Sequence, residues 1–347
     1  MRIIVDIMSG DRAPKEQLLG ACRAAKQPYA KGVDFTLVGN EEIIRQLAKE
    51  NKLDISNFEI KNTTEVLTMC DEPMSVMREK KESSLGVGLR ALAAGEGDAF
   101  VSSGNTGALF CGSSLIVKRV KGIQRAAIGA VLPLTSPLIL MDSGASVKVN
   151  DEYLHQFAIM GSAYMSAIYG VKSPRVAILN NGSEASKGTE LQIAAYERLS
   201  HDEKLNFVGN VEGNKLPFDA CDVAVCDGFV GNVVLKSIEG RGKLFSGELK
   251  AMFKKNPLRI LSYLLVKRGL DDFKKKFDAK EHGGAPILGI SKVVIKAHGS
   301  SDANAIKNAV RQAIYFVETC INTDIAVYAV DYDEKKMIAE TEKIYNN

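Results

Sequence analysis

Several polar, glycine-rich turns follow apolar stretches in this chain, and they carry the residue types best suited to chemistry. In the segment Cys221–Lys236, Val223 and Val225 alternate as in a buried strand. Asp227-Gly228 breaks that pattern, Gly231-Asn232 follow, and the segment then continues as a helix. Backbone N–H groups at a helix start suit a phosphate or a developing oxyanion. Glycine placed there only for its conformational freedom is the alternative.

A second turn follows a predicted strand that ends at Val101. It offers hydroxyl, amide and glycine groups at the start of a helix, namely Ser103, Gly104, Asn105, Thr106 and Gly107. Such groups can hold an anion. Thr106 as a simple helix N-cap is the alternative.

A third turn, Asn180–Glu190, follows the predicted strand Arg175–Leu179 and precedes a helix. Lys187 lies close to the start of that helix, where a positive charge opposes the helix dipole. Binding an anion together with the helix amides would explain its position, and a solvated lysine is the alternative. A fourth turn, His298–Asp302, follows the predicted strand Val293–Ala297, and Asp302 or Ser301 could cap the next helix.

Alternating strands and helices must position these turns. The predicted strands Ile3–Val5 and Phe35–Val38 are each followed by a helix, which favours a doubly wound α/β sheet; Ala127–Leu132 and Leu138–Met141 are also predicted strands. Ligands of such sheets bind outside the carboxyl ends of the strands. We therefore expect one anion-binding site. Because no nucleophile elbow or catalytic-triad order is present, we expect an enzyme that holds an anionic nucleophile against an electrophile.

Composition excludes several classes of protein. The chain has 347 residues, of which 46% are hydrophobic, and this is enough to form the core of one large domain or of two intertwined domains. Charged residues make up 25%, an ordinary share for a soluble protein. A net charge of +3 gives no indication of a nucleic-acid partner. No signal peptide and no membrane-spanning run is expected. Six unevenly spaced cysteines indicate reduced thiols in a cytoplasmic protein, and four histidines without paired ligand spacing give no support for a metal site.

The segment Lys254–Phe277 is amphipathic and basic. Its apolar residues include Leu258, Leu261, Tyr263, Leu264 and Leu265. Such a segment suits an anionic membrane surface, and a helical hairpin packed on a partner subunit is the alternative. We expect both roles, with the oligomer contact at the base and the membrane contact at the tip. The segment Met74–Ser84 is predicted as the surface of a basic helix.

The chain resembles the bacterial phosphate:acyl-ACP acyltransferase family, the PlsX family of phospholipid synthesis. Six motifs from about residue 1 to about residue 320 carry the resemblance: Ser103–Leu109, Asn180–Gly188, Phe207–Gly213, Cys226–Lys236, His282–Pro286 and Lys296–Asp302. The resemblance implies a three-layer α/β/α fold with a mixed sheet, like isocitrate and isopropylmalate dehydrogenases, and a homodimer. It implies a single intertwined catalytic domain over residues 1–330, a helical membrane and dimer segment at 250–280, and a tail at 331–347. The implied reaction converts long-chain acyl-ACP and orthophosphate to acyl phosphate and free ACP, without a cofactor, at the inner face of the cell membrane.

For this reaction we assign roles to residues as a mechanistic hypothesis. Lys187 neutralises phosphate and the oxyanion, Asn232 donates to the same centre, and His298 protonates the leaving sulfur or binds phosphate. The implied phosphate- and substrate-binding set is Ser103, Gly104, Asn105, Thr106, Gly107, Asn180, Glu184, Asp227, Gly228, Gly231, Ser300 and Asp302. The acidic carrier would dock on Arg78, Lys80 and Lys81 or on the Lys254–Lys276 segment.

Two positions depart from the family pattern, since Arg12 stands for a histidine and Ser146 for an asparagine. The arginine fork still suits an anion. A phosphotransacetylase-like enzyme acting on acyl-CoA and a non-catalytic, membrane-associated acyl-carrier scaffold remain alternatives. A metal-dependent dehydrogenase on the same fold would need a carboxylate cluster and a nucleotide fingerprint that are not recognisable here.

Overall fold

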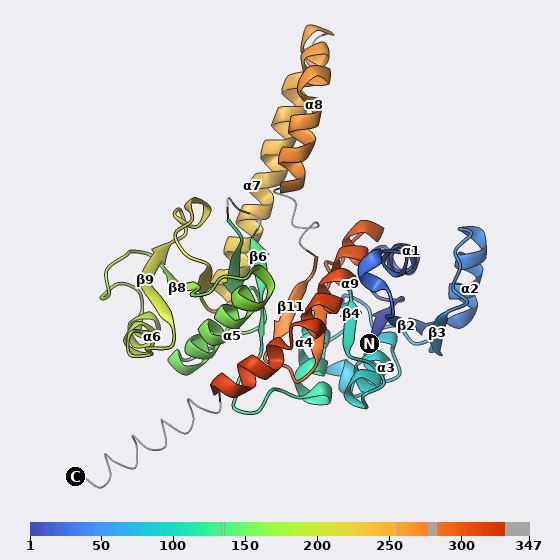
Figure 1. Ribbon diagram of the computed structural model, residues 1–347, viewed down its shortest axis with the longest axis horizontal. Coiled ribbons are helices and arrows are strands. Elements are labelled where there is room, and N and C mark those ends of the chain that lie inside the picture. Colours follow the sequence, from blue (N-terminus) through green and yellow to red (C-terminus); the bar gives the residue numbers. More distant parts are fainter. Residues whose placement is uncertain (133, 135, 256, 277–282, 330–347) are drawn as a thin grey trace.

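The protein is an α/β fold in which two sheets lie beside each other and a helical hairpin stands away from the body (Figure 1). The computed structural model describes residues 1–132, 134, 136–255, 257–276 and 283–329. The predicted tail at 331–347 and His282 lie outside the described residues.

The first sheet places the ends of β1, β4 and β12 at one edge. Its strands run in the order β3 (Phe58–Asn62), β2 (Asp34–Gly39), β1 (Arg2–Asp6), β4 (Ala99–Ser102), β12 (Val293–Lys296), β11 (Ala285–Leu288) and β5 (Ala127–Ile128). The first five strands are parallel, and β11 is antiparallel to both of its neighbours. The turns after β4 and β12 therefore share one edge, as ligand-binding turns of open α/β sheets do.

The second sheet brings together the turns after β7, β10 and β8. Its order is β6 (Ala130–Leu132), β7 (Leu138–Met141), β10 (Val223–Val225), β8 (Arg175–Asn180) and β9 (Asn206–Glu212). All are parallel except β6, which is antiparallel to β7.

The single strand predicted at Ala127–Leu132 is wrong, because this stretch forms two strands in different sheets. The chain changes sheets at Gly129, whose N–H donates to the carbonyl of Pro286 at 3.0 Å. A β-carbon there would lie 2.8 Å from Cδ1 of Ile139. A residue without a side chain lets the chain cross between the sheets at this point.

Alternating strand residues bury both faces of the sheets. Ile3 and Val5 join one buried cluster, whereas Ile4 joins the cluster on the other face. The first cluster is covered by α1 (Lys15–Ala25), α5 (Asp151–Tyr169), α6 (Glu190–Ser200) and α9 (Ala303–Glu318). The other faces are covered by α3 (Ser84–Ala93), α4 (Thr106–Gly112) and the first part of α7 (Gly228–Lys254); α2 (Glu41–Glu50) packs beside β3. The predicted α/β layering with a mixed set of strands is confirmed.

The basic helix surface predicted at Met74–Ser84 is wrong. A short 3-10 turn, Pro73–Met77, is followed by further turns, and α3 begins only at Ser84. The side chain of Ser83 caps α3 by accepting from the N–H of Gly86. This cap sets the start of the helix after the basic residues rather than before them.

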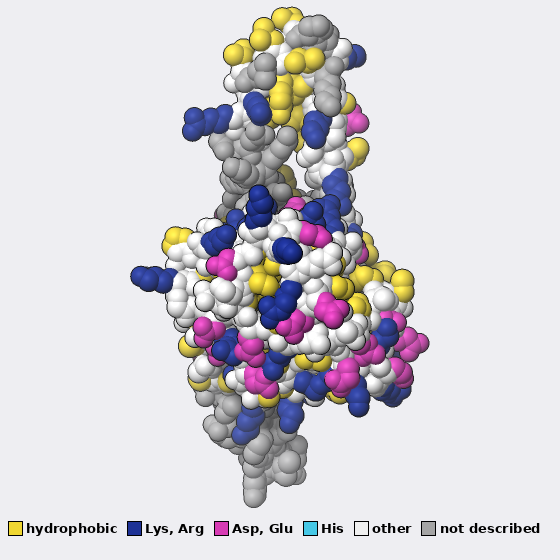
Figure 2. Space-filling model, turned by 90° about the vertical axis from the view of Figure 1, so that its right-hand side faces the viewer, with side chains coloured by type: hydrophobic (Ala, Val, Ile, Leu, Met, Phe, Trp, Pro, Cys, Tyr) yellow, Lys and Arg dark blue, Asp and Glu magenta, His cyan; other side chains and the backbone are white. Residues whose placement is uncertain are grey.

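The protruding hairpin consists of the end of α7 and of α8 (Pro257–Lys276). The rings of Phe253 and Tyr263 pack between the two helices with centroids 5.5 Å apart. Figure 2 shows hydrophobic side chains on the upper part of the hairpin, with Lys and Arg side chains beside and below them. No helix in the described part of the chain is long and apolar enough to cross a bilayer.

Candidate active site

The turn after β7 is built around the carboxylate of Asp142. This side chain is buried and accepts the backbone N–H groups of Ile128, Ala145 and Ser146 at 2.6–3.0 Å. Burial raises the pKa of Asp142, and the backbone hydrogen bonds oppose that rise. The hydroxyl of Ser146 accepts from Nε of Arg125 at 2.8 Å. Ser146, one of the two departures from the family pattern, thus helps to fix this turn.

The start of α7 packs directly on the Asp142 turn. Asp227 caps the helix by accepting from the N–H groups of Phe229 and Val230. The N–H of Gly228 donates to the carbonyl of Ser146, and that of Gly231 to the carbonyl of Asp227. All four amides from Gly228 to Gly231 already have acceptors. The predicted phosphate cradle at this helix start is therefore not supported, because a carboxylate and two carbonyls occupy its donors.

Asn232 projects from α7 beside this turn. A β-carbon on Gly144 would lie 3.5 Å from Cβ and Cγ of Asn232, so the asparagine covers that glycine. Its own side chain is exposed. On α7, Val230, Val234 and Ile238 pack toward the second sheet, which leaves Asn232 on a different face of the helix.

The same helix face carries Lys236, Glu239 and Lys243, at spacings of four, seven and eleven residues from Asn232. These three side chains also influence the pKa of His298 through their charges. Burial lowers the pKa of His298 most, and Lys236 lowers it further. The Asn232 face of α7, a helix that follows the second sheet, thus carries charges that influence the His298 turn of the first sheet.

The His298 turn fixes the imidazole tautomer. Nδ1 of His298 accepts from the N–H of Ser300 at 3.2 Å and lies 3.0 Å from the Ser300 hydroxyl. In the neutral ring the proton therefore resides on Nε2, which is left as a donor. Asp302 is the N-cap of α9 and accepts from the N–H of Ala305, so its predicted capping role is confirmed.

The edge of the first sheet holds two buried charged residues that motif reasoning missed. Asp6 ends β1 and accepts from the hydroxyl of Ser102 at 2.7 Å. Lys296 ends β12, is only 7% exposed, and donates from Nζ to the carbonyl of Ala297 at 2.6 Å. Burial lowers the pKa of Lys296 to about 8. A lysine that closes the apolar run Val293–Ile295 is the one sequence signal for this site.

The turn after β4 is stabilised mainly by contacts within the protein. Ser103 donates to the carbonyl of Ser9 at 2.7 Å, and Asn105 caps α4 by accepting from the N–H of Ala108. The amide nitrogen of Asn105 donates to the carbonyls of Met69 and Asp71. Asn105 rather than Thr106 is thus the cap, and the side chains of Ser103 and Asn105 are already engaged.

The turn after β8 presents Lys187 on the surface. Nδ2 of Asn180 donates to the carbonyl of Lys187 at 3.0 Å, and the N–H of Lys187 donates to the carbonyl of Glu184 at 3.1 Å. The side chains of Lys187 and Glu184 both lie over Gly182. Thr189 and Gln192 form a capping box at the start of α6, two residues after Lys187. Lys187 and Asn232 therefore follow neighbouring parallel strands, β8 and β10, at the same edge.

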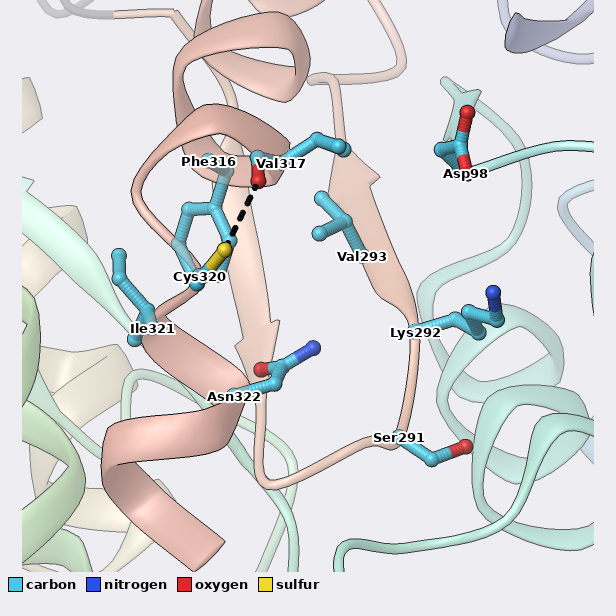
Figure 3. A pocket seen from close by; sticks show the side chains of 9 residues that line it. All are labelled: Asp98, Ser291, Lys292, Val293, Phe316, Val317, Cys320, Ile321 and Asn322. Atoms are coloured by element: carbon cyan, nitrogen blue, oxygen red, sulfur yellow. Dashed lines mark hydrogen bonds between the residues drawn. The ribbon is translucent and has the colours of Figure 1, made fainter. Parts of the chain in front are cut away.

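A small cavity lies at the opposite ends of the strands and contains none of the predicted site residues (Figure 3). Asp98 precedes β4, Lys292 precedes β12, and Phe316 and Cys320 close the cavity from the side of α9. Arg12 is exposed at the edge where the predicted turns gather, in the turn after β1. Within the described ranges, no group of three or more His, Cys, Asp or Glu residues is placed to hold a metal ion.

Comparison with solved structures defines the class of fold. A phosphotransacetylase from Streptococcus pyogenes superposes with a TM-score of 0.61 at 16% identity, over 92% of this chain and 94% of that one. The family model described as "Fatty acid synthesis protein" matches residues 1–323. A phosphate acyltransferase from Thermoanaerobacter pseudethanolicus is 43% identical over 92% of this chain and 94% of its own, and one from Desulfitobacterium hafniense is 44% identical over 92% and 95%. The chain belongs to this family, which confirms the resemblance to the PlsX family drawn from its motifs.

Proposed function

We propose that this chain is a phosphate acyltransferase that transfers a long-chain acyl group from acyl carrier protein to orthophosphate. The observation that carries the proposal is the packing of Asn232 over Gly144 of the turn after β7, on the same helix face as three charged residues that influence the pKa of His298. An amide donor, an imidazole N–H and lysine side chains are the kinds of group that an anionic nucleophile and a developing oxyanion require. The relatives of this chain that carry the name phosphate acyltransferase support the same activity.

The reaction needs positioning and charge stabilisation rather than a strong base. A phosphate oxygen, already ionised at neutral pH, forms the new bond to the thioester carbon, and the carbonyl oxygen becomes an oxyanion. Lys187 and the Asn232 amide stabilise that oxyanion. When it collapses, the carbon–sulfur bond breaks, and the proton that hydrogen phosphate brought in goes to the leaving thiolate. The Nε2–H of neutral His298 stabilises the leaving sulfur by a hydrogen bond and keeps its own proton. The products are acyl phosphate and free carrier thiol.

The hairpin is proposed to serve as both dimer contact and membrane contact. Leu258, Leu261 and Leu265 on α8 are 74%, 56% and 82% exposed, which is more apolar surface than an isolated helix should present to water. Lys255, Arg259, Lys267 and Arg268 flank them in the sequence and are exposed. Figure 2 shows Lys and Arg side chains beside the apolar ones on the hairpin. Basic and apolar groups together suit an anionic membrane surface. The protein then works in the cytoplasm as a peripheral membrane homodimer.

The acidic carrier is proposed to dock on basic groups near the base of the hairpin. The other surface considered is partly engaged, because Nζ of Lys80 donates to the carbonyl of Val66 at 2.8 Å and pairs with Asp71 at 3.6 Å. Lys236 and Lys243 on α7 influence the pKa of His298 through their charges, and Lys236 also pairs with Glu239 at 2.8 Å. A carrier bound there would bring its pantetheine arm directly to the reacting groups.

The test is transfer of labelled orthophosphate into an organic-extractable, hydroxylamine-labile product. Palmitoyl-ACP serves as donor and palmitoyl-CoA as the comparison. We expect label transfer that depends on the ACP donor. Transfer only from acyl-CoA would support a phosphotransacetylase-like enzyme instead, and saturable acyl-ACP binding without any transfer would support a scaffold.

A further inference from the structure

An extra residue in β9 changes which of its side chains face α6. Val176 of β8 pairs with Phe207 of β9, and Ile178 of β8 pairs with Asn210. Two residues of β8 are thus matched by three of β9, which is a β-bulge, and Gly209 within it has a positive φ of 94°. Since paired residues of neighbouring strands share a face of the sheet, Phe207 and Asn210 both point to the face that α6 covers.

Asn210 in this position holds the turn that carries Lys187. Nδ2 of Asn210 donates to the carbonyl of Glu184 at 2.8 Å. The same carbonyl accepts from the N–H of Lys187 at 3.1 Å. On the other side, Nδ2 of Asn180 donates to the carbonyl of Lys187 at 3.0 Å. The backbone of Lys187 is therefore held through both of its peptide groups, and one of these two supports depends on a side chain of β9.

The side chain of Lys187 leaves this turn in a direction that the turn itself sets. A β-carbon on Gly182 would lie 2.9 Å from Cγ of Lys187 and 3.0 Å from Oε2 of Glu184. The stem of the lysine and the carboxylate of Glu184 thus pass close over the same glycine. A shift of the Glu184 backbone would therefore also shift the place from which the ammonium of Lys187 acts.

The stability of the strand alone does not account for an asparagine at position 210. Its Oδ1 is buried and has no hydrogen-bond donor within the described part of the chain. A buried acceptor without a partner is costly. The donor that Asn210 directs at the Lys187 turn is the one polar contact that offsets this cost among the described residues.

We infer that Asn210 is a positioning residue for Lys187: through the carbonyl of Glu184 it fixes the place from which the ammonium reaches the oxyanion of the thioester. The inference rests on the proposed function for the role of Lys187. It also gives a role to the motif Phe207–Gly213, which the proposed mechanism does not use. Asn210 itself touches no reacting atom. Such support matters because a displacement of about 1 Å in a catalytic group can lower the rate by about 10²-fold.

The same strand offers a matched control. Asn206 begins β9, at the edge of the sheet opposite to the Lys187 turn, and its Nδ2 donates to the carbonyl of Ser173 at 3.0 Å. Asn206→Ala and Asn210→Ala each remove one hydrogen bond from an asparagine of β9 to a loop carbonyl. Both variants should therefore lose a similar, small amount of stability in urea unfolding, and only Asn210→Ala should affect the reaction.

Steady-state kinetics of acyl phosphate formation test the inference directly. Asn210→Ala should lower kcat by roughly tenfold or more and change KM for either substrate by less than about twofold, whereas Asn206→Ala should leave both parameters unchanged. In a Lys187→Ala background, Asn210→Ala should cost no further rate, because it acts only through Lys187. Unchanged kcat in Asn210→Ala, or the same tenfold loss in the Lys187→Ala background, would overturn the inference.

Hydrogen exchange over residues 180–189, followed by mass spectrometry of the full chain, gives a readout that does not need turnover. Exchange should be faster in Asn210→Ala than in wild type, and unchanged in Asn206→Ala. Asn210→Asp keeps the shape of the side chain and removes the donor, so it tests the same hydrogen bond if Asn210→Ala does not fold. Wild type without acyl transfer would refute the proposed function, whereas an active wild type with unchanged exchange and kcat in the Asn210 variants would refute the inference alone.

Discussion

A β-carbon on Gly231 would lie 1.9 Å from the carbonyl oxygen of Asp142, so the first turn of α7 touches the turn after β7 without room for any side chain. The contacted atom belongs to the backbone of a turn held by the hydrogen bonds that the Asp142 carboxylate accepts. This contact sets where α7 lies, and α7 in turn carries both Asn232 and Lys236. The geometry of the site therefore depends on one glycine that takes no part in the chemistry.

Gly231→Ala should destabilise the protein by about 3 kcal/mol, at the upper end of the range for overpacking, because backbone atoms must move. Urea unfolding followed by circular dichroism measures this. Gly240→Ala, in the same helix but with open space around the new β-carbon, is the control and should gain up to about 1 kcal/mol from helix propensity. Equal stabilities of the two variants would refute the close contact.

Lys187→Ala and Asn232→Ala should each lower kcat for acyl phosphate formation by ~10²–10³, the usual effect of removing one oxyanion donor. Both side chains are exposed, so the fold should survive, which circular dichroism can check. Lys172→Ala removes an exposed lysine just before β8 and should leave the rate unchanged. A Lys187→Ala or Asn232→Ala enzyme with near-normal turnover would remove that residue from the mechanism.

Local pattern was sufficient to predict the elements that carry these residues. The alternation of Val223 and Val225 predicted β10, and Asp227 followed by glycine predicted where α7 begins. The local pattern was not sufficient to predict what the polar side chains do. The caps at Asp227 and Asn105 use side chains that the sequence equally suggested for ligands, and only the hydrogen bonds distinguish the two uses.

Contacts between distant segments explain the features that sequence could not provide. The crossing between sheets at Gly129 depends on Pro286 and Ile139 lying beside it. The pKa of Lys296 depends on Asp6 at the end of β1 and on Lys236 of α7, which are far apart in the sequence. No local periodicity reports such neighbours, so a lysine within a familiar motif was passed over.

Lys236→Gln should raise the pKa of His298 toward its ordinary value of 6.5. Removing a nearby positive charge makes protonation of the imidazole easier, and the freed carboxylate of Glu239 acts in the same direction. Imidazole titration by NMR in wild type and variant measures the change. Lys243→Gln should produce a smaller rise, because Lys243 has the weakest of the effects on His298.

The lowered pKa of His298 also makes the stability of the folded protein depend on pH. Since the pKa of His298 is lower in the folded protein, the unfolded chain takes up the proton first as pH falls through about 6.5, and wild type loses stability on that side. The loss should be smaller in Lys236→Gln. If the imidazole titrates identically in wild type and both lysine variants, α7 does not face His298 in solution.

Leu261→Glu/Leu265→Glu should weaken binding to phosphatidylglycerol vesicles by about tenfold or more, because each buried leucine contributes ~1.5–3 kcal/mol and the new charges are repelled by an anionic surface. Flotation with these vesicles and with neutral phosphatidylcholine vesicles measures the effect, and wild-type binding should also fall with added salt.

Ile193→Glu is the control for this experiment. It changes an exposed apolar residue on α6, away from the hairpin, and the variant should bind like wild type. Acyl transfer from soluble palmitoyl-ACP should be retained in the double variant, since α8 carries none of the reacting groups. If the double variant binds anionic vesicles as strongly as wild type does, the membrane role of the hairpin is refuted and only its proposed dimer contact remains.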